Sequence, residues 1–536
     1  MQSHGDETEK NNAAYVDLRL SVCHNNKKAT EAQMAHWLDS AIFYEIYPQS
    51  FRDSNADGIG DIPGIIEKLD YVKDLGCNAI WLNPCFESPF GDAGYDVSDF
   101  YSVAPRYGTN ADLKRLFDEA HRKGIRVLLD LVAGHTSSEH PWFKESMKAQ
   151  RNEYTDRYVW TNSIWVKPGM NCILGISERN GVCAVNFFSH QPALNYGFYK
   201  PDKPWQQSMD DEGPRATLAE LMKIMRFWLD MGCDGFRVDM ASSLIKNDED
   251  SKGNMALWGK VRAFLDEKYP EAVLVSEWMD PEKAIGGGFH MDFSPELFRK
   301  EKPYFASEGG CDFSLLAEKY IRYYEKTKDK GYISIYSGNH DSKRLALTHD
   351  ETAIKLVFAF ILSMPGVPFI YYGDEIGMRF VENLVSVEGG YGRTGSRSPM
   401  QWDGTINAGF GLSSPEKLYI PIDPDENRPT VEKSIADENS IYHEVKRLIS
   451  LRRAHPALSN NGDIEFIYAE KDSYPIAYVR EGGGERAVVA INPSAAAASF
   501  DCNLSPKNEI FRLGGETVFA GGKCIIPPRS AVIAEI

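Results

Sequence analysis

The chain has 536 residues, of which 43% are hydrophobic and 12% aromatic, so it can build a large core, and wholesale disorder is excluded. Asp and Glu outnumber Lys and Arg by 77 to 59, which gives a net charge of −18. A chain this acidic repels phosphate groups, so nucleic acids and anionic membranes are poor partners. A neutral small-molecule substrate is favoured instead.

No apolar run in the sequence is long enough to cross a bilayer, and the first residues lack the basic and apolar segments of a signal peptide. The nine cysteines are scattered and form no CxxC pair, a pattern typical of reduced thiols rather than of a disulfide framework or a zinc site. We therefore expect a cytoplasmic protein without a membrane partner. The sequence leaves the oligomeric state open.

Strands and helices alternate along most of the chain. Residues 1–35 are polar and weakly periodic, and we expect them to form a loosely held N-terminal extension. Apolar residues at helical spacing predict helices, the clearest of them at 64–76, 111–124, 218–232 and 441–454. Short apolar segments predict eight strands at 43–48, 79–84, 126–132, 235–240, 272–278, 289–293, 333–341 and 368–377. This alternation predicts an α/β fold, a (β/α)8 TIM barrel.

Two segments break the alternation. Residues 135–195 are irregular and rich in Trp, Asn, Ser and Pro, too long for a plain loop, and they predict a small domain inserted after the third strand. From about 459 to 536, short strands are separated by glycine turns, which predicts a C-terminal antiparallel β-sandwich. The barrel is then expected to comprise residues 36–134 and 196–458.

Charged and polar side chains gather where the predicted strands end. The reactive groups of such barrels stand at the C-terminal ends of the strands. Those ends carry carboxylates and histidines, among them Asp130, His135, Asp239, Glu277, His340 and Asp341. Ion-paired residues with a structural task are the alternative, but a mouth with several carboxylates and aromatic neighbours suits glycoside hydrolysis. There one carboxyl protonates the leaving oxygen, and another attacks the anomeric carbon or activates water.

Four motifs at these ends make the chain similar to the α-amylase family of glycoside hydrolases (family 13). They are DLVAGH at 130–135, GFRVD at 235–239, SEW at 276–278 and NHD at 339–341. The resemblance implies that Asp239 is the nucleophile and Glu277 the general acid/base. It also implies that Asp341 is the third carboxylate, which orients the sugar and stabilises the transition state.

The same resemblance implies a set of substrate-binding residues. Arg237 lies two residues before Asp239, so on a strand both side chains point to one face, and the guanidinium can keep the carboxylate ionised. The positions expected to contact the sugar are Tyr95, Asp96, His135, Arg237, His340 and Arg397, with Tyr95 stacking on the sugar ring. A clamp of Asp96 and Arg397 is expected to hold the hydroxyls of a terminal glucose.

The segment DSNADGIGD at 53–61 has the oxygen spacing of a calcium-type loop. Asp53, Asn55, Asp57 and Asp61 supply side-chain oxygens, and Ile59 offers a carbonyl. The bidentate Glu of an EF-hand is absent from the twelfth position, so the loop is not an EF-hand. A polar turn without metal is the alternative. The oligo-1,6-glucosidase and trehalose synthase branch carries a similar loop, which implies a structural Ca²⁺ here.

The finer function is expected from the branch of the family. QPALN at 191–195 and SRSPMQWD at 396–403 resemble segments of the oligo-1,6-glucosidase branch, which implies a retaining, exo-acting α-glucosidase for short oligosaccharides. Three positions depart from the family pattern: Gly134, Ala193 and Met240. Met240 follows the nucleophile at the position that tracks linkage preference, so linkage stays open. A glucosyl-transferring or isomerising enzyme and an endo-acting α-amylase are the enzymatic alternatives, and a non-catalytic sugar-binding homologue is a third.

Overall fold

The computed structural model describes residues 35–175, 177–294, 304–305 and 312–536. The expected N-terminal extension at 1–35 lies outside these residues except for Ala35. The eight strands expected from the sequence form a closed barrel of parallel strands within the described chain. They are β1 (Phe43–Ile46), β2 (Ala79–Leu82), β5 (Arg126–Leu131), β8 (Gly235–Val238), β9 (Val273–Ser276), β10 (Met291–Phe293), β11 (Tyr332–Tyr336) and β12 (Val367–Tyr371).

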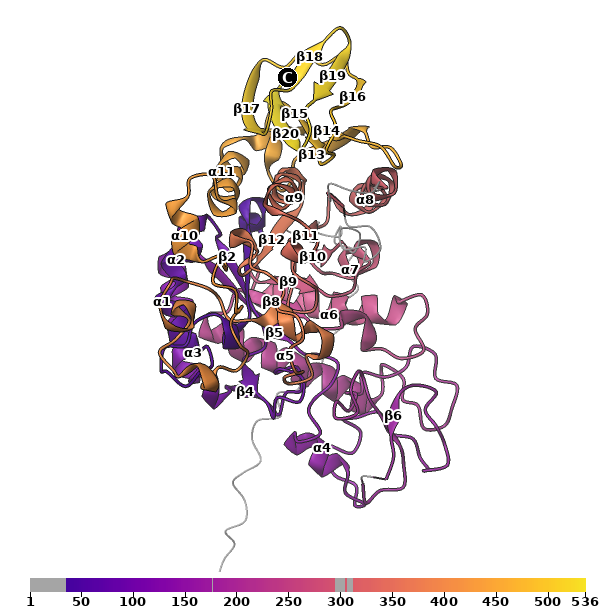
Figure 1. Cartoon of the computed structure of the whole chain (residues 1–536). Helices are drawn as coiled ribbons and strands as arrows, with labels where there is room; N and C mark the ends of the chain where they lie inside the picture. The colour runs from indigo at the N-terminus through magenta and orange to yellow at the C-terminus, as the bar shows by residue number, and fades with distance from the viewer. Residues whose placement is uncertain (1–34, 176, 295–303, 306–311) are drawn as a thin grey trace, which may run out of the picture. The chain divides into compact units, whose positions relative to one another are not determined.

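The strands are short, apolar and buried, because helices cover the outside of the barrel (Figure 1). The larger described helices are α1 (Ile62–Glu67), α2 (Leu69–Leu75), α3 (Asn110–Arg122), α5 (Glu212–Met231), α6 (Lys252–Lys268), α7 (Pro281–Gly286), α8 (Phe313–Thr327), α9 (Glu351–Ser363), α10 (Val431–Ala436) and α11 (Ile441–Ala454). The TIM-barrel prediction is confirmed. None of these helices is both long and apolar enough to pass through a lipid bilayer.

The helix expected over 64–76 differs from the prediction. It begins at Ile62, where the Asp61 carboxylate accepts a hydrogen bond from the N–H of Gly64, and it is divided at Lys68 into α1 and α2. Lys68 has left the helical region, with φ −107° and ψ 6°. The side chain of Lys68 lies over the ring of Trp402, 4.3 Å from its centroid.

The segment after β5 holds little regular structure, as the sequence predicts. It contains α4 (Pro141–Ser146) and the two-residue strands β6 (Cys172–Ile173) and β7 (Cys183–Ala184). A bridge between His135 and Ala193 ties its two ends together. A further small sheet, β3 (Phe86–Glu87) with β4 (Asp99–Val103), lies in the loop after β2.

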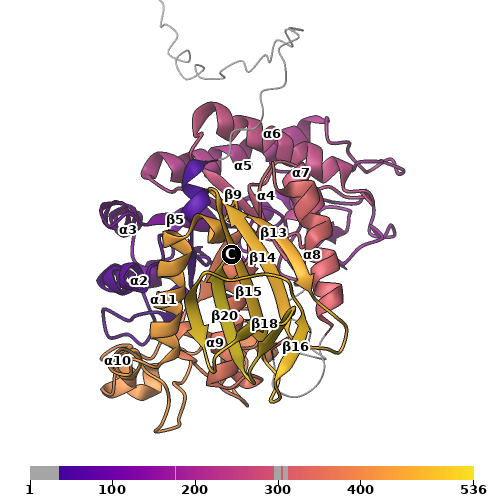
Figure 2. The ribbon, with the colours of Figure 1, turned by 90° about the horizontal axis from the view of Figure 1, so that it is seen from above.

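The C-terminal region forms two antiparallel sheets with an apolar cluster that includes Phe500, Cys524 and Val532. The sheets contain β13 (Asp463–Tyr468), β14 (Ile476–Gly482), β15 (Glu485–Asn492), β20 (Ser530–Glu535) and β17 (Asn508–Leu513), and then β16 (Ala498–Asp501), β19 (Lys523–Ile526) and β18 (Val518–Ala520). The larger sheet lies against α9 (Figure 2), where Ser363 and Tyr478 share a hydrogen bond of 2.6 Å.

Candidate active site

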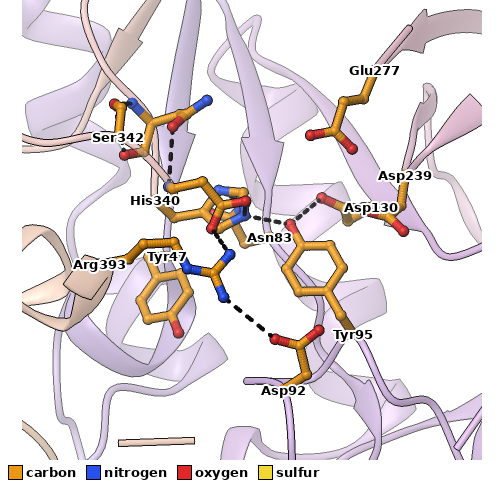
Figure 3. A network of polar contacts seen from close by, with 12 residues as sticks. Tyr47, Asn83, Asp92, Tyr95, Asp130, Asp239, Glu277, His340, Ser342 and Arg393 are labelled. Carbon is orange, nitrogen blue, oxygen red and sulfur yellow. Dashed lines mark hydrogen bonds and ion pairs between the residues drawn. The ribbon is translucent and has the colours of Figure 1, made fainter. Parts of the chain in front are cut away.

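Strand register brings the expected catalytic residues together at one end of the barrel. In the β5–β8 pair Asp130 stands opposite Arg237, and in the β8–β9 pair Val238 stands opposite Ser276. Asp239 and Glu277 are the next residues along their strands, so register makes them neighbours. The carboxylates of both face the same region in Figure 3, together with Asp130.

Arg237 is the central cation of this group, with only 2% of its surface exposed. Its Nη1 lies 3.2 Å from Asp130 and 3.4 Å from Asp239, and its Nη2 lies 2.9 Å from Oε1 of Glu277. The expectation that Arg237 neighbours the nucleophile position is therefore met. A buried charge of this kind is tolerated because carboxylates surround it.

The protonation of Asp239 depends on its surroundings. Burial raises its pKa well above the ordinary value, and the negative charge of Glu277 raises the pKa further, while Arg237 opposes both effects. Oε2 of Glu277 also accepts a hydrogen bond of 3.0 Å from the N–H of Met240. The nucleophile role requires an ionised Asp239, and the Arg237 guanidinium is the contact that favours this form.

Tyr95 and His340 form a stacked pair beside the carboxylates, with ring centroids 5.3 Å apart. The hydroxyl of Tyr95 lies 2.7 Å from Nε2 of His340 and donates to Asp130 at 3.1 Å, as Figure 3 shows. Nδ1 of His340 lies 2.9 Å from Oε1 of Glu45. Burial lowers the pKa of His340 to about 3, so its imidazole is neutral.

Asp341 is held by two arginines from the 3-10 helix Tyr391–Arg397. Its Oδ1 accepts hydrogen bonds from Nη1 of Arg393 at 2.7 Å and from Nη2 of Arg397 at 2.8 Å. Burial alone would raise the pKa of Asp341, but His340 and the two guanidinium groups lower it below the ordinary value. Asp341 is therefore an anion over the whole physiological pH range. Arg397 contacts the expected third carboxylate rather than Asp96.

The structure does not place Asp96 in the expected clamp. Asp96 is fully buried, and its carboxylate accepts hydrogen bonds from the N–H groups of Gly91 and Asp92 and from the hydroxyl of Ser88. It organises its own loop and is not directed at the mouth of the barrel. Its oxygens are already committed to backbone donors, so the expected Asp96–Arg397 clamp is wrong.

Asp92 and Arg393 take the place expected of that clamp. Nη2 of Arg393 lies 3.8 Å from Oδ1 of Asp92, an interaction drawn in Figure 3, while Oδ2 accepts a hydrogen bond from Gln191. Burial raises the pKa of Asp92 to about 7. Both residues lie close to positions named in the sequence analysis, Asp92 three residues before Tyr95 and Arg393 four residues before Arg397.

His135 is fully engaged by protein atoms. Its Nε2 lies 3.0 Å from the carbonyl oxygen of Tyr95, and its Nδ1 lies 3.2 Å from the amide nitrogen of Asn186. Nε2–H therefore donates to the carbonyl, and Nδ1 accepts from Asn186, so a sugar hydroxyl would have to share one of these nitrogens. Asn186, which also contacts Ser243 and Met240, is a residue of the site that the sequence analysis missed.

The loop at 53–61 folds around its own side-chain oxygens. Asp53 accepts hydrogen bonds from the N–H groups of Asn55, Ala56 and Gly58, and Asp57 accepts one from Ile59. Asp53 and Asp61 are both buried, and burial raises the pKa of Asp61, which the charge of Asp53 raises further. In the described chain no three acidic, His or Cys side chains converge on a metal position. A cation here would need the amide and carbonyl oxygens as well.

The alpha-amylase catalytic domain profile matches residues 45–461. The chain belongs to the alpha-amylase family. It is therefore a glycoside hydrolase by family, which confirms the expectation that the chain is an enzyme. The resemblance to the oligo-1,6-glucosidase and trehalose synthase branch is also confirmed.

Two curated relatives illustrate that branch. The chain is 31% identical to an oligo-1,6-glucosidase of Parageobacillus thermoglucosidasius, over 91% of this chain and 94% of that protein. It is 33% identical to the trehalose synthase/amylase TreS of Mycolicibacterium smegmatis, over 83% of this chain and 81% of that protein. A relative named as an oligo-1,6-glucosidase and one named as a trehalose synthase/amylase thus have similar sequence identity to this chain.

Two solved structures are similar to this chain in fold. An inactive double mutant of MUTB has a TM-score of 0.80 and 26% identity over 93% of this chain and 100% of that chain. An isomaltulose synthase mutant from Erwinia rhapontici, in complex with D-glucose, has a TM-score of 0.80 and 25% identity over 93% of this chain and 99% of that chain. The likeness covers the barrel and the C-terminal region together.

Proposed function

We propose that the enzyme is a retaining, exo-acting α-glucosidase of short α-linked oligosaccharides. The observation that carries the proposal is the charged group at the barrel mouth, where Arg237 contacts both Asp239 and Glu277, and Arg393 contacts both Asp341 and Asp92. The first pair supplies the reacting carboxylates. The second supplies a polar end that can hold the hydroxyls of one terminal sugar.

In this proposal Asp239 attacks the anomeric carbon while Glu277 donates its proton to the departing oxygen. The bond to the leaving sugar breaks, and a covalent glucosyl ester with Asp239 forms. Glu277, now ionised, takes a proton from water, and the resulting hydroxide equivalent displaces Asp239. Two inversions retain the α configuration. Asp341, kept anionic by its arginines, stabilises the positive charge that develops on the sugar ring.

Exo action is supported by contacts at the clamp end of the pocket. The ring of Phe188, from the inserted segment, lies 5.8 Å from the ring of Tyr391, which begins the 3-10 helix that carries Arg393. His190 stacks on Phe188 and packs so closely against Gly91 that a Cβ there would lie 2.8 Å from Nε2. Side chains from two distant segments thus meet beside Asp92, which favours a closed end over a through-going cleft.

A glucosyl-transferring or isomerising enzyme is the second candidate, and the curated and structural relatives favour it specifically. Several are named as trehalose synthases, and one structure is titled an alpha-glucosyl transfer enzyme. The four carboxylates and two arginines named above would serve hydrolysis and glucosyl transfer alike. The outcome depends on whether water or a second sugar reaches the glucosyl ester first.

We further propose that the 53–61 loop holds a structural Ca²⁺. Asp53, Asn55, Asp57 and Asp61 would bind it through side-chain oxygens, and Ile59 through its carbonyl oxygen. The mutual repulsion of the buried Asp53 and Asp61 supports a cation at this position. Calcium prefers such an all-oxygen ligand set, and it would connect the ends of the loop that follows β1.

A substrate panel tests the proposed activity. Maltose, isomaltose, sucrose, trehalose and starch are each incubated with the enzyme, and the products are followed by NMR from the first minutes. The proposal predicts α-glucose as the first product from at least one of the disaccharides. A new disaccharide that forms without free glucose would establish the isomerising alternative.

A further inference from the structure

Asp292, at the centre of β10, has a buried carboxylate that accepts hydrogen bonds from the end of β9 and from the turn after it. It is fully buried. Its carboxylate accepts hydrogen bonds from the hydroxyl of Ser276 at 2.5 Å and from the N–H groups of Trp278, Met279 and Asp280 at 3.1, 3.4 and 2.8 Å. The donors are the last residue of β9, Ser276, and three residues of the turn that follows it, so one carboxylate holds this turn.

That turn carries the proposed general acid/base. Ser276 comes directly before Glu277, and Trp278 comes directly after it. The N–H of Glu277 itself donates to the carbonyl of Val238 at 3.0 Å, which fixes the residue from the β8 side. Met279 has φ +59°, a left-handed conformation that a non-glycine residue adopts only when its surroundings hold it there.

We propose that Asp292 is a positioning residue that sets the place of the Glu277 carboxyl for proton transfer. The inference rests on the proposed role of Glu277 as general acid/base. A carboxylate is the side chain best suited to the task, since its two oxygens carry enough lone pairs for four donors, whereas an amide directs its own N–H₂ at them. Proton transfer needs heavy atoms within hydrogen-bond distance of each other, so a small shift of the turn has a large effect on the rate.

The test uses a pair of substrates that differ in their need for a proton. Maltose loses a sugar oxygen that must be protonated, whereas α-glucosyl fluoride loses fluoride, which leaves with little help from an acid. For Asp292→Asn we expect kcat/KM for maltose to fall by roughly 10²-fold, and kcat/KM for α-glucosyl fluoride to fall by less than about threefold. Equal losses on the two substrates would overturn the proposal, because a general structural defect affects both.

Two further variants distinguish an error in the role of Glu277 from an error in the role of Asp292. Glu277→Gln should show the same selective loss to a greater degree. If Glu277→Gln lacks this selectivity, the general-acid role of Glu277 is wrong and the Asp292 proposal falls with it, whereas a selective Glu277→Gln beside an unselective Asp292→Asn overturns the Asp292 proposal alone. Asp234→Asn is the matched control, since Asp234 is a buried carboxylate at the opposite end of β8 that binds His121, Arg126 and the N–H of Val127. It should change the two kcat/KM values equally, if at all.

Ser276→Ala covers the case in which Asp292→Asn does not fold. This variant removes one of the four donors and leaves the carboxylate in place. We expect a smaller loss, about threefold to tenfold in kcat/KM on maltose, with α-glucosyl fluoride unchanged. An Ser276→Ala enzyme with the same ratio of activities on the two substrates as the wild type would count against the proposal.

Discussion

An ion pair of 2.7 Å joins Nη1 of Arg393 to Oδ1 of Asp341. Arg397 contacts the same oxygen, so two guanidinium groups from one short helix hold the third carboxylate of the site. Arg393 also reaches Asp92 in the loop after β2. One arginine thereby connects the carboxylate expected to stabilise the transition state with the proposed end of the sugar pocket.

Replacement of Arg393 tests this connection. For Arg393→Ala we expect kcat/KM on maltose to fall by roughly 10²-fold or more, because the clamp loses its cation and Asp341 loses one of its charged donors. Steady-state kinetics on maltose measures the effect. Arg379→Ala is the matched control, since Arg379 also bridges two aspartates, Asp423 and Asp425, and should change kcat/KM little.

Loss of the nucleophile should abolish turnover. Asp239→Ala is expected to lower kcat by several orders of magnitude on both maltose and α-glucosyl fluoride, because no covalent glucosyl ester can form. Circular dichroism and the melting temperature should stay close to those of the wild type. A folded variant that keeps activity within about tenfold of the wild type would contradict the assignment.

The buried carboxyl of Glu375, which is not among the proposed site residues, gives a pH prediction. Burial raises the pKa of Glu375 to about 7, and its Oε1 accepts hydrogen bonds from Tyr44 and Tyr71. A raised folded-state pKa means that the folded protein binds the extra proton, so stability is lost as the pH rises from about 4 to about 7. Glu375→Gln removes that loss, worth roughly 3 kcal/mol at most above pH 7.

The measurement is the melting temperature of Glu375→Gln and of the wild type between pH 5 and pH 8. The difference, variant minus wild type, should increase with pH. The exposed Glu438 supplies the control, because Glu438→Gln should give a difference that does not change over this range. A Glu375→Gln difference that stays flat or declines with pH would show that the carboxyl is ionised in the folded protein.

Chelation tests the calcium loop. EDTA should lower the melting temperature more than it lowers initial activity, because the 53–61 loop holds none of the proposed catalytic residues, and a cation that binds only the folded state stabilises it by mass action. Added Ca²⁺ should restore the melting temperature, and Asp57→Asn should weaken that response. A melting curve that EDTA leaves unchanged would identify the loop as a metal-free turn.

Much of the fold could be predicted because its signals are local. Each barrel strand is a short apolar run followed by a polar end, and Asp239, Glu277 and Asp341 fall within such ends. Asp92 and Arg393 were missed because their pairing joins segments far apart in the chain, which no local pattern reports. Asp96 was chosen because it neighbours Tyr95, but its carboxylate accepts hydrogen bonds from Ser88, Gly91 and Asp92 of its own loop, contacts that the sequence does not report.

Asn186 and Asp292 were missed for a related reason. Asn186 lies in the irregular inserted segment, where the sequence has no period that indicates which side chain faces the barrel. Asp292 was read as part of an apolar strand, and only the β9–β10 pairing shows that its carboxylate lies against the turn after Ser276. Both residues contact partners that are distant in the sequence, so no local pattern predicts the contact.

The most direct test of the central claim is the early digestion of maltoheptaose, followed by chromatography and NMR while less than a tenth of the substrate is consumed. A retaining exo-acting α-glucosidase with a closed pocket end releases glucose and maltohexaose in equal amounts, with the glucose first seen as its α-anomer. Initial products spread over maltose, maltotriose and longer fragments, or glucose that first appears as the β-anomer, would contradict the account.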